Sequence, residues 1–263
     1  MKIRLSLLTM LLFAGIISYA QEVTADEIIS NYIENTGGEE AWTALEGIKM
    51  QAKVNQGGME IPIEIVQLED GRTYTKITFQ GQPIMQNVFN GEVLWGTNFQ
   101  TRKAEKVDQE TTDNMKLEAN DFPTPFLNYK EKGYTVELLG KETIEGTETY
   151  KVKVVKEPKT IAGEEVEDVT FYYFETENFV PIAQETEVKQ GPVAGKMQFI
   201  TLSDYQEVDG LYFPFAMTQG LKGQPGQGIM IENIELNPDV SDDTFAFPEA
   251  MGNTEEAGDN DGK

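Results

Sequence analysis

The sequence predicts a mainly β protein, in which about eleven or twelve strands form an antiparallel sheet and helices act as a lid over it. Two observations carry this prediction. Glycine-containing turn signals, such as Asp70-Gly71 and Asn90-Gly91, recur about every eight to twelve residues. Between these turns, apolar and polar side chains alternate, which is the period of a half-buried strand. Such closely spaced turns are typical of hairpins and not of the crossover helices of a parallel sheet.

The first twenty residues are expected to be a secretory signal peptide and not part of the fold. Lys2 and Arg4 precede a short apolar run at 5–17, and Ala20 ends a small-residue cleavage site. We expect cleavage after Ala20. The alternative, an uncleaved anchor, is disfavoured because the apolar run is too short to span a bilayer.

Two short helices are predicted next. Thr24 and Glu27 match a capping box, and apolar residues at 28, 29, 32 and 33 form one helical stripe that ends at Gly37-Gly38. A second helix at 39–45 carries Trp42. An alternating strand follows Gly47, and a meander of strands is expected at 59–68, 73–80, 84–89 and 93–99.

The middle of the chain breaks the alternation. Residues 108–120 favour a helix, and Pro123 and Pro125 forbid a central strand, so a proline-started helical turn at 122–129 should lie over the sheet as a lid. Strands are expected to resume at 134–139, 149–155, 169–174, 180–188 and 196–205, with a polar loop at 157–167.

The closing stretch, 204–248, reads as two strands joined by a glycine-rich loop and followed by a clasp. Pro214 lies inside the first of these strands, which indicates an edge position or a bulge. Asn237-Pro238 ends the second strand, and Phe245 and Phe247 are expected to return the chain end to the sheet. We therefore expect one domain at 21–248, followed by a disordered acidic tail at 249–263.

Composition excludes several kinds of chemistry. The chain contains no His and no Cys, which excludes Ser-His-Asp and Cys-His catalysis and removes the usual ligands of zinc, copper and haem. No phosphate-binding loop is present, and we expect neither a metal nor a cofactor. The net charge of −24 argues against nucleic acid and against tight docking on anionic lipid. Carboxylate-pair catalysis stays open, because 45 acidic residues form many pairs.

Large apolar residues are the remaining candidates for a site. They would either fill an ordinary core or line a cavity for an apolar ligand beneath the lid. The candidate lining residues are Met50, Ile63, Ile77, Phe79, Met85, Phe89, Trp95, Phe126, Leu127, Phe171, Phe199, Phe213, Phe215 and Met217.

The chain resembles the LolA/LolB-like outer-membrane lipoprotein-sorting family over nearly all of its mature length. The resemblance lies in NYIENTGGEEAWTALEGIKM, FNGEVLW, LLGKETIEGTETYKVKV, FYYFETENFVP and, above all, DYQEVDGLYFP with IENIELNPDVSDDTFAFP. It implies an incomplete, strongly curved antiparallel β-barrel with N-terminal and central helices over its concave face. It also implies a periplasmic location and an interior that binds the acyl chains of lipoproteins. The arginine that latches the lid in the classical carrier has no match at Arg72 or Arg102.

The leading hypothesis is thus a periplasmic, non-enzymatic carrier of acyl chains, acting in lipoprotein sorting to the outer membrane. Its partners would be lipoprotein acyl chains or another lipid, together with envelope transport proteins. We expect a monomer without a stable membrane anchor. An envelope sensor or protein-interaction module on the same fold is the alternative, and a carboxylate-based secreted hydrolase is the third.

Overall fold

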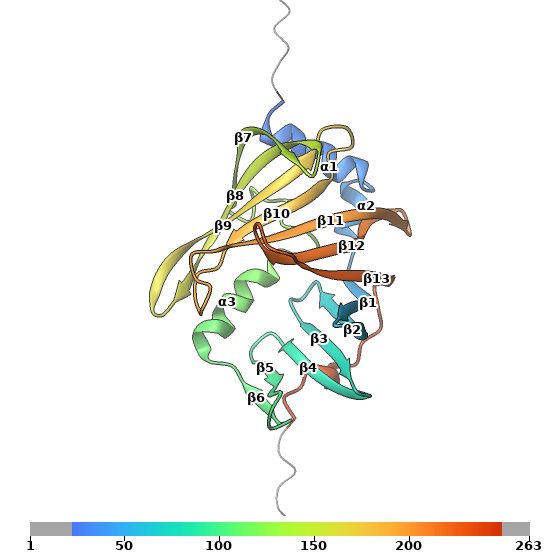
Figure 1. The fold of residues 1–263 in the computed structure, drawn as a ribbon, viewed down its shortest axis with the longest axis vertical. Helices are drawn as coiled ribbons and strands as arrows, with labels where there is room; N and C mark the ends of the chain where they lie inside the picture. Colours follow the sequence, from blue (N-terminus) through green and yellow to red (C-terminus); the bar gives the residue numbers. More distant parts are fainter. Residues whose placement is uncertain (1–22, 249–263) are drawn as a thin grey trace, which may run out of the picture.

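The computed structural model describes residues 23–248, and Figure 1 shows how they are arranged. The predicted signal peptide (1–20) and the predicted disordered tail (249–263) lie outside the described residues. Within them, thirteen strands form one sheet in the order β6-β5-β4-β3-β2-β1-β13-β12-β11-β10-β9-β8-β7. All neighbouring pairs are antiparallel. The predicted antiparallel sheet is confirmed, with slightly more strands than expected.

Two meanders make up this sheet, and they meet where β1 pairs with β13. The first contains β1 (Gly47–Gln56), β2 (Met59–Leu68), β3 (Thr73–Phe79), β4 (Gln82–Phe89), β5 (Leu94–Thr97) and β6 (Ala104–Lys106). The second contains β7 (Thr135–Ile144), β8 (Thr147–Ile161), β9 (Glu164–Glu175), β10 (Pro181–Glu187), β11 (Met197–Val208), β12 (Leu211–Leu221) and β13 (Gln227–Leu236). The helices are α1 (Ala25–Asn35), α2 (Glu39–Thr43) and α3 (Gln109–Ala119), and a short 3-10 helix spans Asp242–Thr244.

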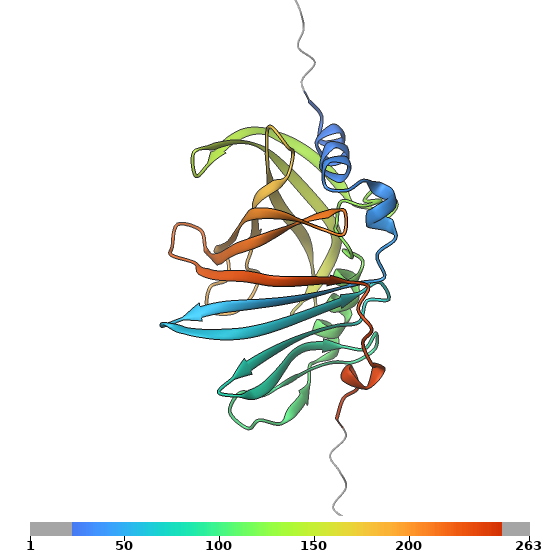
Figure 2. The same ribbon diagram turned by 90° about the vertical axis from the view of Figure 1, so that its right-hand side faces the viewer.

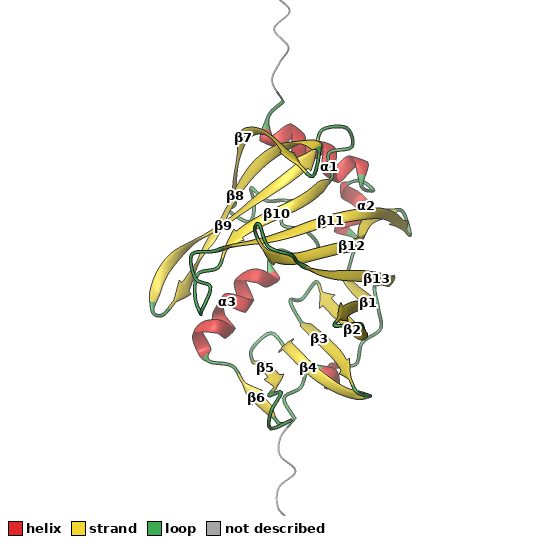
Figure 3. Cartoon of the chain, viewed as in Figure 1, coloured by secondary structure: helices red, strands yellow, loops and turns green. Residues whose placement is uncertain are grey.

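The sheet is strongly curved and does not close into a barrel (Figure 2). Its two edges are β6 and β7. Figure 3 shows α3 between the two ends of the sheet, with β8 and β9 on one side and β3 to β6 on the other. This helix contacts both β8 and β5. The fold class predicted from the sequence and from its resemblance is therefore confirmed.

The register defines two faces of the sheet, because cross-strand partners point to the same side. Ala52 pairs with Ile63, and Ile63 pairs with Ile77. Ile65, two residues from Ile63, lines a cavity together with Met115 of α3. We call this side, which α3 covers, the inner face, and the opposite side the outer face.

The N-terminal helices pack on the inner face near one end of the molecule. The capping box of Thr24 and Glu27 is present, as predicted. Gly37 brings the end of α1 against the β11–β12 turn, because a Cβ atom there would lie 2.6 Å from the carbonyl oxygen of Gly210. Trp42 donates a hydrogen bond to Thr36 at 3.0 Å, which satisfies its buried indole nitrogen.

The C-terminal segment (237–248) covers the outer face of β2 to β5. Phe245 is 1% exposed; its ring packs against Tyr74, and its carbonyl oxygen accepts a hydrogen bond from Trp95 at 3.1 Å. Phe247 lies edge-on against Trp95, with 5.9 Å between the ring centroids. Arg72 forms an ion pair with Asp242 and so joins this segment to the β2–β3 turn.

Two local predictions are wrong. Residues 157–167 are not a loop, because β8 and β9 continue through them as a long hairpin with its turn at Ala162-Gly163. The backbone near this turn forms hydrogen bonds with side chains of α3. Residues 122–129 form successive turns and no helix. Pro214 lies where β12 pairs with β11 but not with β13, so no ladder hydrogen bond is lost there.

Candidate functional site: the inner face beneath helix α3

The inner face is filled at one end by apolar packing. There α1, α2 and the covering loop (121–134) pack against β8, β9, β12 and β13. Phe126 is 4% exposed, and its ring lies edge-on against Tyr32, Tyr172 and Phe174, with centroids 4.8–5.4 Å apart. Side chains therefore pack closely at this end, and a hollow of about 450 Å³ lies there between α1 and the covering loop.

Elsewhere the inner face is only partly covered. Met59, Ile61, Ile63 and Ile65 alternate along β2, and we call these four residues the apolar track. Met59 is 56% exposed, and the three isoleucines are half-buried. On the outer face of the same strand Val66 is fully buried. A β-strand rises about 3.4 Å per residue, so the track is about 20 Å long.

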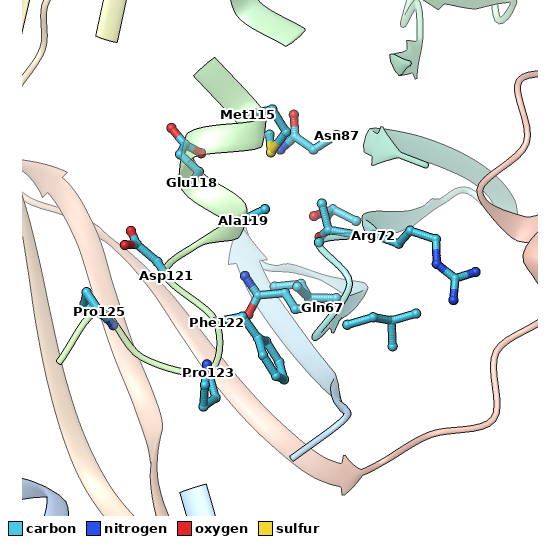
Figure 4. Close-up of a pocket in the computed structure, with 15 residues that line it drawn as sticks. Gln67, Arg72, Asn87, Met115, Glu118, Ala119, Asp121, Phe122, Pro123 and Pro125 are labelled. Atoms are coloured by element: carbon cyan, nitrogen blue, oxygen red, sulfur yellow. The ribbon is translucent and has the colours of Figure 1, made fainter. Parts of the chain in front are cut away.

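At Ile65 the apolar track reaches a cavity of about 360 Å³, shown in Figure 4. One wall consists of β2 to β4, with Gln67 and Asn87 among its side chains. The other wall consists of α3 and the start of the covering loop, where Met115 and Phe122 lie. The cavity thus lies at the junction of the sheet, the lid helix and the loop.

A second cavity, of about 450 Å³, lies on the other side of α3, between the helix and the β8 to β11 region. Met115 and Glu118 line both cavities. Both volumes fall in the range of small-molecule sites, which is about 300–1,000 Å³. Helix α3 is therefore the partition between two hollows of the inner face.

Helix α3 is attached to the β8–β9 hairpin by three polar side chains, Glu110, Asn114 and Glu118, which we call the polar seam. Glu110 accepts hydrogen bonds from the backbone nitrogens of the hairpin turn at 2.7 and 2.8 Å. Asn114 exchanges two hydrogen bonds with the backbone of Thr160, at 2.7 and 3.0 Å. Glu118 forms an ion pair with Lys159 at 2.7 Å. A spacing of four residues places all three on one side of the helix.

Apolar burial contributes much less to the position of α3. Thr112 is its only buried residue. A helix held by solvent-accessible hydrogen bonds and few apolar contacts belongs to the part of a fold that opens at low cost in free energy. Helix α3 is therefore suited to act as a lid that is attached to the β8–β9 hairpin.

The charged groups beside the first cavity are all paired. Arg72 binds Asp70 and Asp242, Glu118 binds Lys159, and Asp121 binds Lys156 at 2.7 Å. Burial alone would lower the pKa of Lys159, but Glu118 and Asp168 raise it above its ordinary value, so this lysine stays charged.

The sequence-predicted lining residues divide into three groups. Eight lie on the inner face of the strands: Met50, Ile63, Ile77, Phe79, Phe89, Phe213, Phe215 and Met217. Phe126 and Leu127 belong to the covering loop, and their side chains are buried in the core. The remaining four, Met85, Trp95, Phe171 and Phe199, lie on the outer face. Whether any of them contacts a ligand stays a prediction.

Sequence reasoning missed the residues that shape the two cavities. Ile65 and Met115 were not among the candidates, and Glu110, Asn114 and Glu118 gave no signal because an exposed polar helix face is common in any protein. The repeat of these three at intervals of four was the only pattern available, and it does not say what the helix contacts.

Comparison with known proteins bears on the fold. No family model matches the sequence, and no curated protein matches it. Among solved structures, a LolA superfamily protein from Nitrosomonas europaea superposes with a TM-score of 0.51 and 14% identity, over 85% of this chain and 98% of that one. A DUF1329 family protein from Desulfovibrio piger superposes with a TM-score of 0.50 and 12% identity, over 83% and 95% of the two chains.

The resemblance predicted from the sequence is thus confirmed at the level of the fold. Within residues 23–248 no helix has the length and apolarity needed to cross a membrane. In the same range, no group of three or more acidic side chains is arranged to hold a metal ion. An open, strongly curved antiparallel sheet with helices on its inner face is the LolA-like fold, and this chain has it.

Proposed function

We propose that the protein binds the acyl chain of a lipid on its inner face and carries it through the bacterial envelope without catalysing a reaction. The observation that carries this proposal is the apolar track, which leads from an exposed rim at Met59 to the cavity at Ile65. Half-buried isoleucines on the inner side of a curved sheet are apolar surface that a ligand would cover. The track is about 20 Å long. The hydrocarbon core of a bilayer is about 30 Å thick, so one acyl chain spans about 15 Å.

Two features support a binder over an enzyme. The sequence lacks His and Cys, and the charged side chains that line the first cavity are held in ion pairs. Binding of an acyl chain needs neither a nucleophile nor a proton donor, because removal of apolar surface from water supplies the free energy.

The narrower proposal is lipoprotein sorting. The LolA-like fold and the expected signal peptide support a carrier that receives a lipoprotein acyl chain in the periplasm. Its partners would then be the proteins of the envelope that load and unload it. An envelope sensor that uses the same fold to bind a protein partner is the competing function.

Native mass spectrometry of the purified chain and uptake of a fluorescent fatty acid test the proposal. Replacement of Ile61 and Ile63 by Thr should weaken fatty-acid binding about ten-fold, because two branched side chains lose apolar contact with the ligand. Met230→Thr is the matched control, since Met230 is 53% exposed on the outer face. Absence of bound lipid and of fatty-acid uptake would reject the proposal, and a stoichiometric protein partner without lipid would favour the sensor.

A further inference from the structure

The β5–β6 hairpin presents an aromatic side chain to solvent. Phe99 lies in its turn and is 57% exposed. The turn is well ordered by hydrogen bonds, since the side-chain oxygen of Asn98 accepts from the backbone nitrogens of Gln100 and Thr101 at 2.9 and 3.0 Å. The backbone nitrogen of Arg102 donates to the carbonyl oxygen of Asn98 at 2.8 Å. Phe99 is thus held outward by a rigid turn.

The same hairpin is basic, although the chain as a whole is strongly acidic. Residues 98–106 contain three basic side chains, Arg102, Lys103 and Lys106, and one acidic side chain, Glu105. That carboxylate accepts a hydrogen bond from Asn98 at 3.0 Å. We call this element (98–106) the basic hairpin.

Its cations are also free of ion pairs. Across residues 23–248, six lysines and arginines form no salt bridge: Arg102, Lys103, Lys106, Lys132, Lys153 and Lys196. Half of these lie in the basic hairpin. Lys106 lies over the ring of Phe247, at 4.9 Å from its centroid, whereas Arg102 and Lys103 follow Phe99 in the turn. In a protein with more than twice as many acidic as basic residues, two cations without salt bridges close in sequence to an exposed aromatic ring point to an external anionic surface.

The net charge of −24 does not prevent such an interaction. At physiological ionic strength charges separated by more than about 8–10 Å are screened, so the hairpin responds to its own local field. An aromatic ring flanked by Arg and Lys is the composition favoured at the membrane–water interface, where the ring enters the headgroup region and the cations meet anionic lipid.

We infer that the basic hairpin docks on an anionic lipid surface, with Phe99 in the headgroup layer and Arg102 and Lys103 against lipid phosphates. The hairpin leads directly into α3 through Asp108, the residue that caps this helix. Docking would therefore bring the lid helix and its two cavities close to the membrane. The inference does not depend on acyl binding by the inner face. Docking through a few cations and one aromatic ring is weak and reversible.

Fluorescence of an F99W variant of the purified chain tests the docking. Trp42 and Trp95 are 2% and 4% exposed, so the new indole is the one that senses its surroundings. Vesicles of phosphatidylglycerol and phosphatidylethanolamine should shift the emission of this variant to the blue. Vesicles of phosphatidylcholine alone should not, and added salt should reverse the shift.

Co-sedimentation with the same anionic vesicles provides the quantitative test in the unlabelled protein. Phe99→Ser should weaken vesicle binding about ten-fold. The double variant Arg102→Gln, Lys103→Gln should weaken vesicle binding about twenty-five-fold, because the loss of each cation weakens it about five-fold. Val193→Ser, Lys196→Gln is the matched control, because it removes an exposed apolar residue and an unpaired cation from another hairpin.

The control should bind vesicles as the unchanged protein does. No binding to anionic vesicles, equal binding to phosphatidylcholine, or equal losses in the control and the hairpin variants would each overturn the inference. Uptake of a fluorescent fatty acid should be unchanged by Phe99→Ser, which separates this result from failure of the proposed acyl binding.

Discussion

The attachment of α3 gives the sharpest prediction, because one side chain in the polar seam can be removed with little other change. Asn114→Ala deletes two hydrogen bonds to the backbone of Thr160, at 2.7 and 3.0 Å. Both lie at the solvent-exposed side of the helix, so each contributes near the low end of the usual 0.5–1.5 kcal/mol. The variant should therefore favour release of the helix by about 1 kcal/mol, which corresponds to about a five-fold change in the opening equilibrium.

Native-state hydrogen exchange measures this change directly. In Asn114→Ala the amides of α3 should exchange about five-fold faster, whereas the amides of β8, β9 and α1 should keep their rates. The melting temperature should hardly change, because Thr112 is the only buried residue of α3. Lys116→Gln is the control, since it breaks an exposed ion pair with Asp113 within the helix and leaves the polar seam intact.

A uniform loss of protection across the core would refute this reasoning. It would mean that α3 is part of the cooperative fold and that the helix does not open on its own. Unchanged exchange in α3 would also count against the polar seam, because other contacts would then hold the helix.

Two further predictions concern stability. Phe245→Ala should lower the free energy of unfolding by about 3–5 kcal/mol in guanidinium titrations, because the side chain is only 1% exposed. Fatty-acid binding on the opposite face of the sheet should stay the same. A loss below about 1 kcal/mol would show that the C-terminal segment is not integral to the fold. Lys130 and Tyr129 lower the pKa of Asp26 below its ordinary value of 3.8. Their contacts with the ionised carboxylate therefore stabilise the folded protein fully above pH 3.8, and this stabilisation is lost as the pH falls through the lower pKa of the folded state. Asp26→Asn should therefore lower the melting temperature at neutral pH and have a smaller effect as the pH falls below 3.8, and an equal effect at all pH values would contradict the assignment.

The sheet could be predicted from the sequence where local signals were complete. Strand β2 was predicted at 59–68, as observed, because its inner residues alternate and glycine turns bound it on both sides. Residues 157–167 lack this alternation. They are strands because β8 and β9 continue to pair with each other through them, and α3, far away in the sequence, provides Glu110 and Asn114 as partners for the backbone at the hairpin end. Such long-range contacts leave no trace in a local pattern.

The site was predicted less well, because alternation does not say which face of a strand is the inner one. Met85 and Phe89 are four residues apart and would share a face in a regular strand. An irregularity in the β3–β4 register, with Asn87 at a positive φ, moves them to opposite faces. Phe171 belongs to a run with aromatic residues on both faces, so its position on the outer face could not be read from the pattern.

The claim that an acyl chain lies along the inner face is tested most directly by photo-crosslinking. A fatty acid with a diazirine at the end of its chain would be bound, irradiated and located by peptide mass spectrometry. The proposed function predicts adducts on the apolar track at 61–65 and on Met115 of α3. Adducts confined to the outer face, at Met85 or Trp95, or no specific adduct at all, would contradict it.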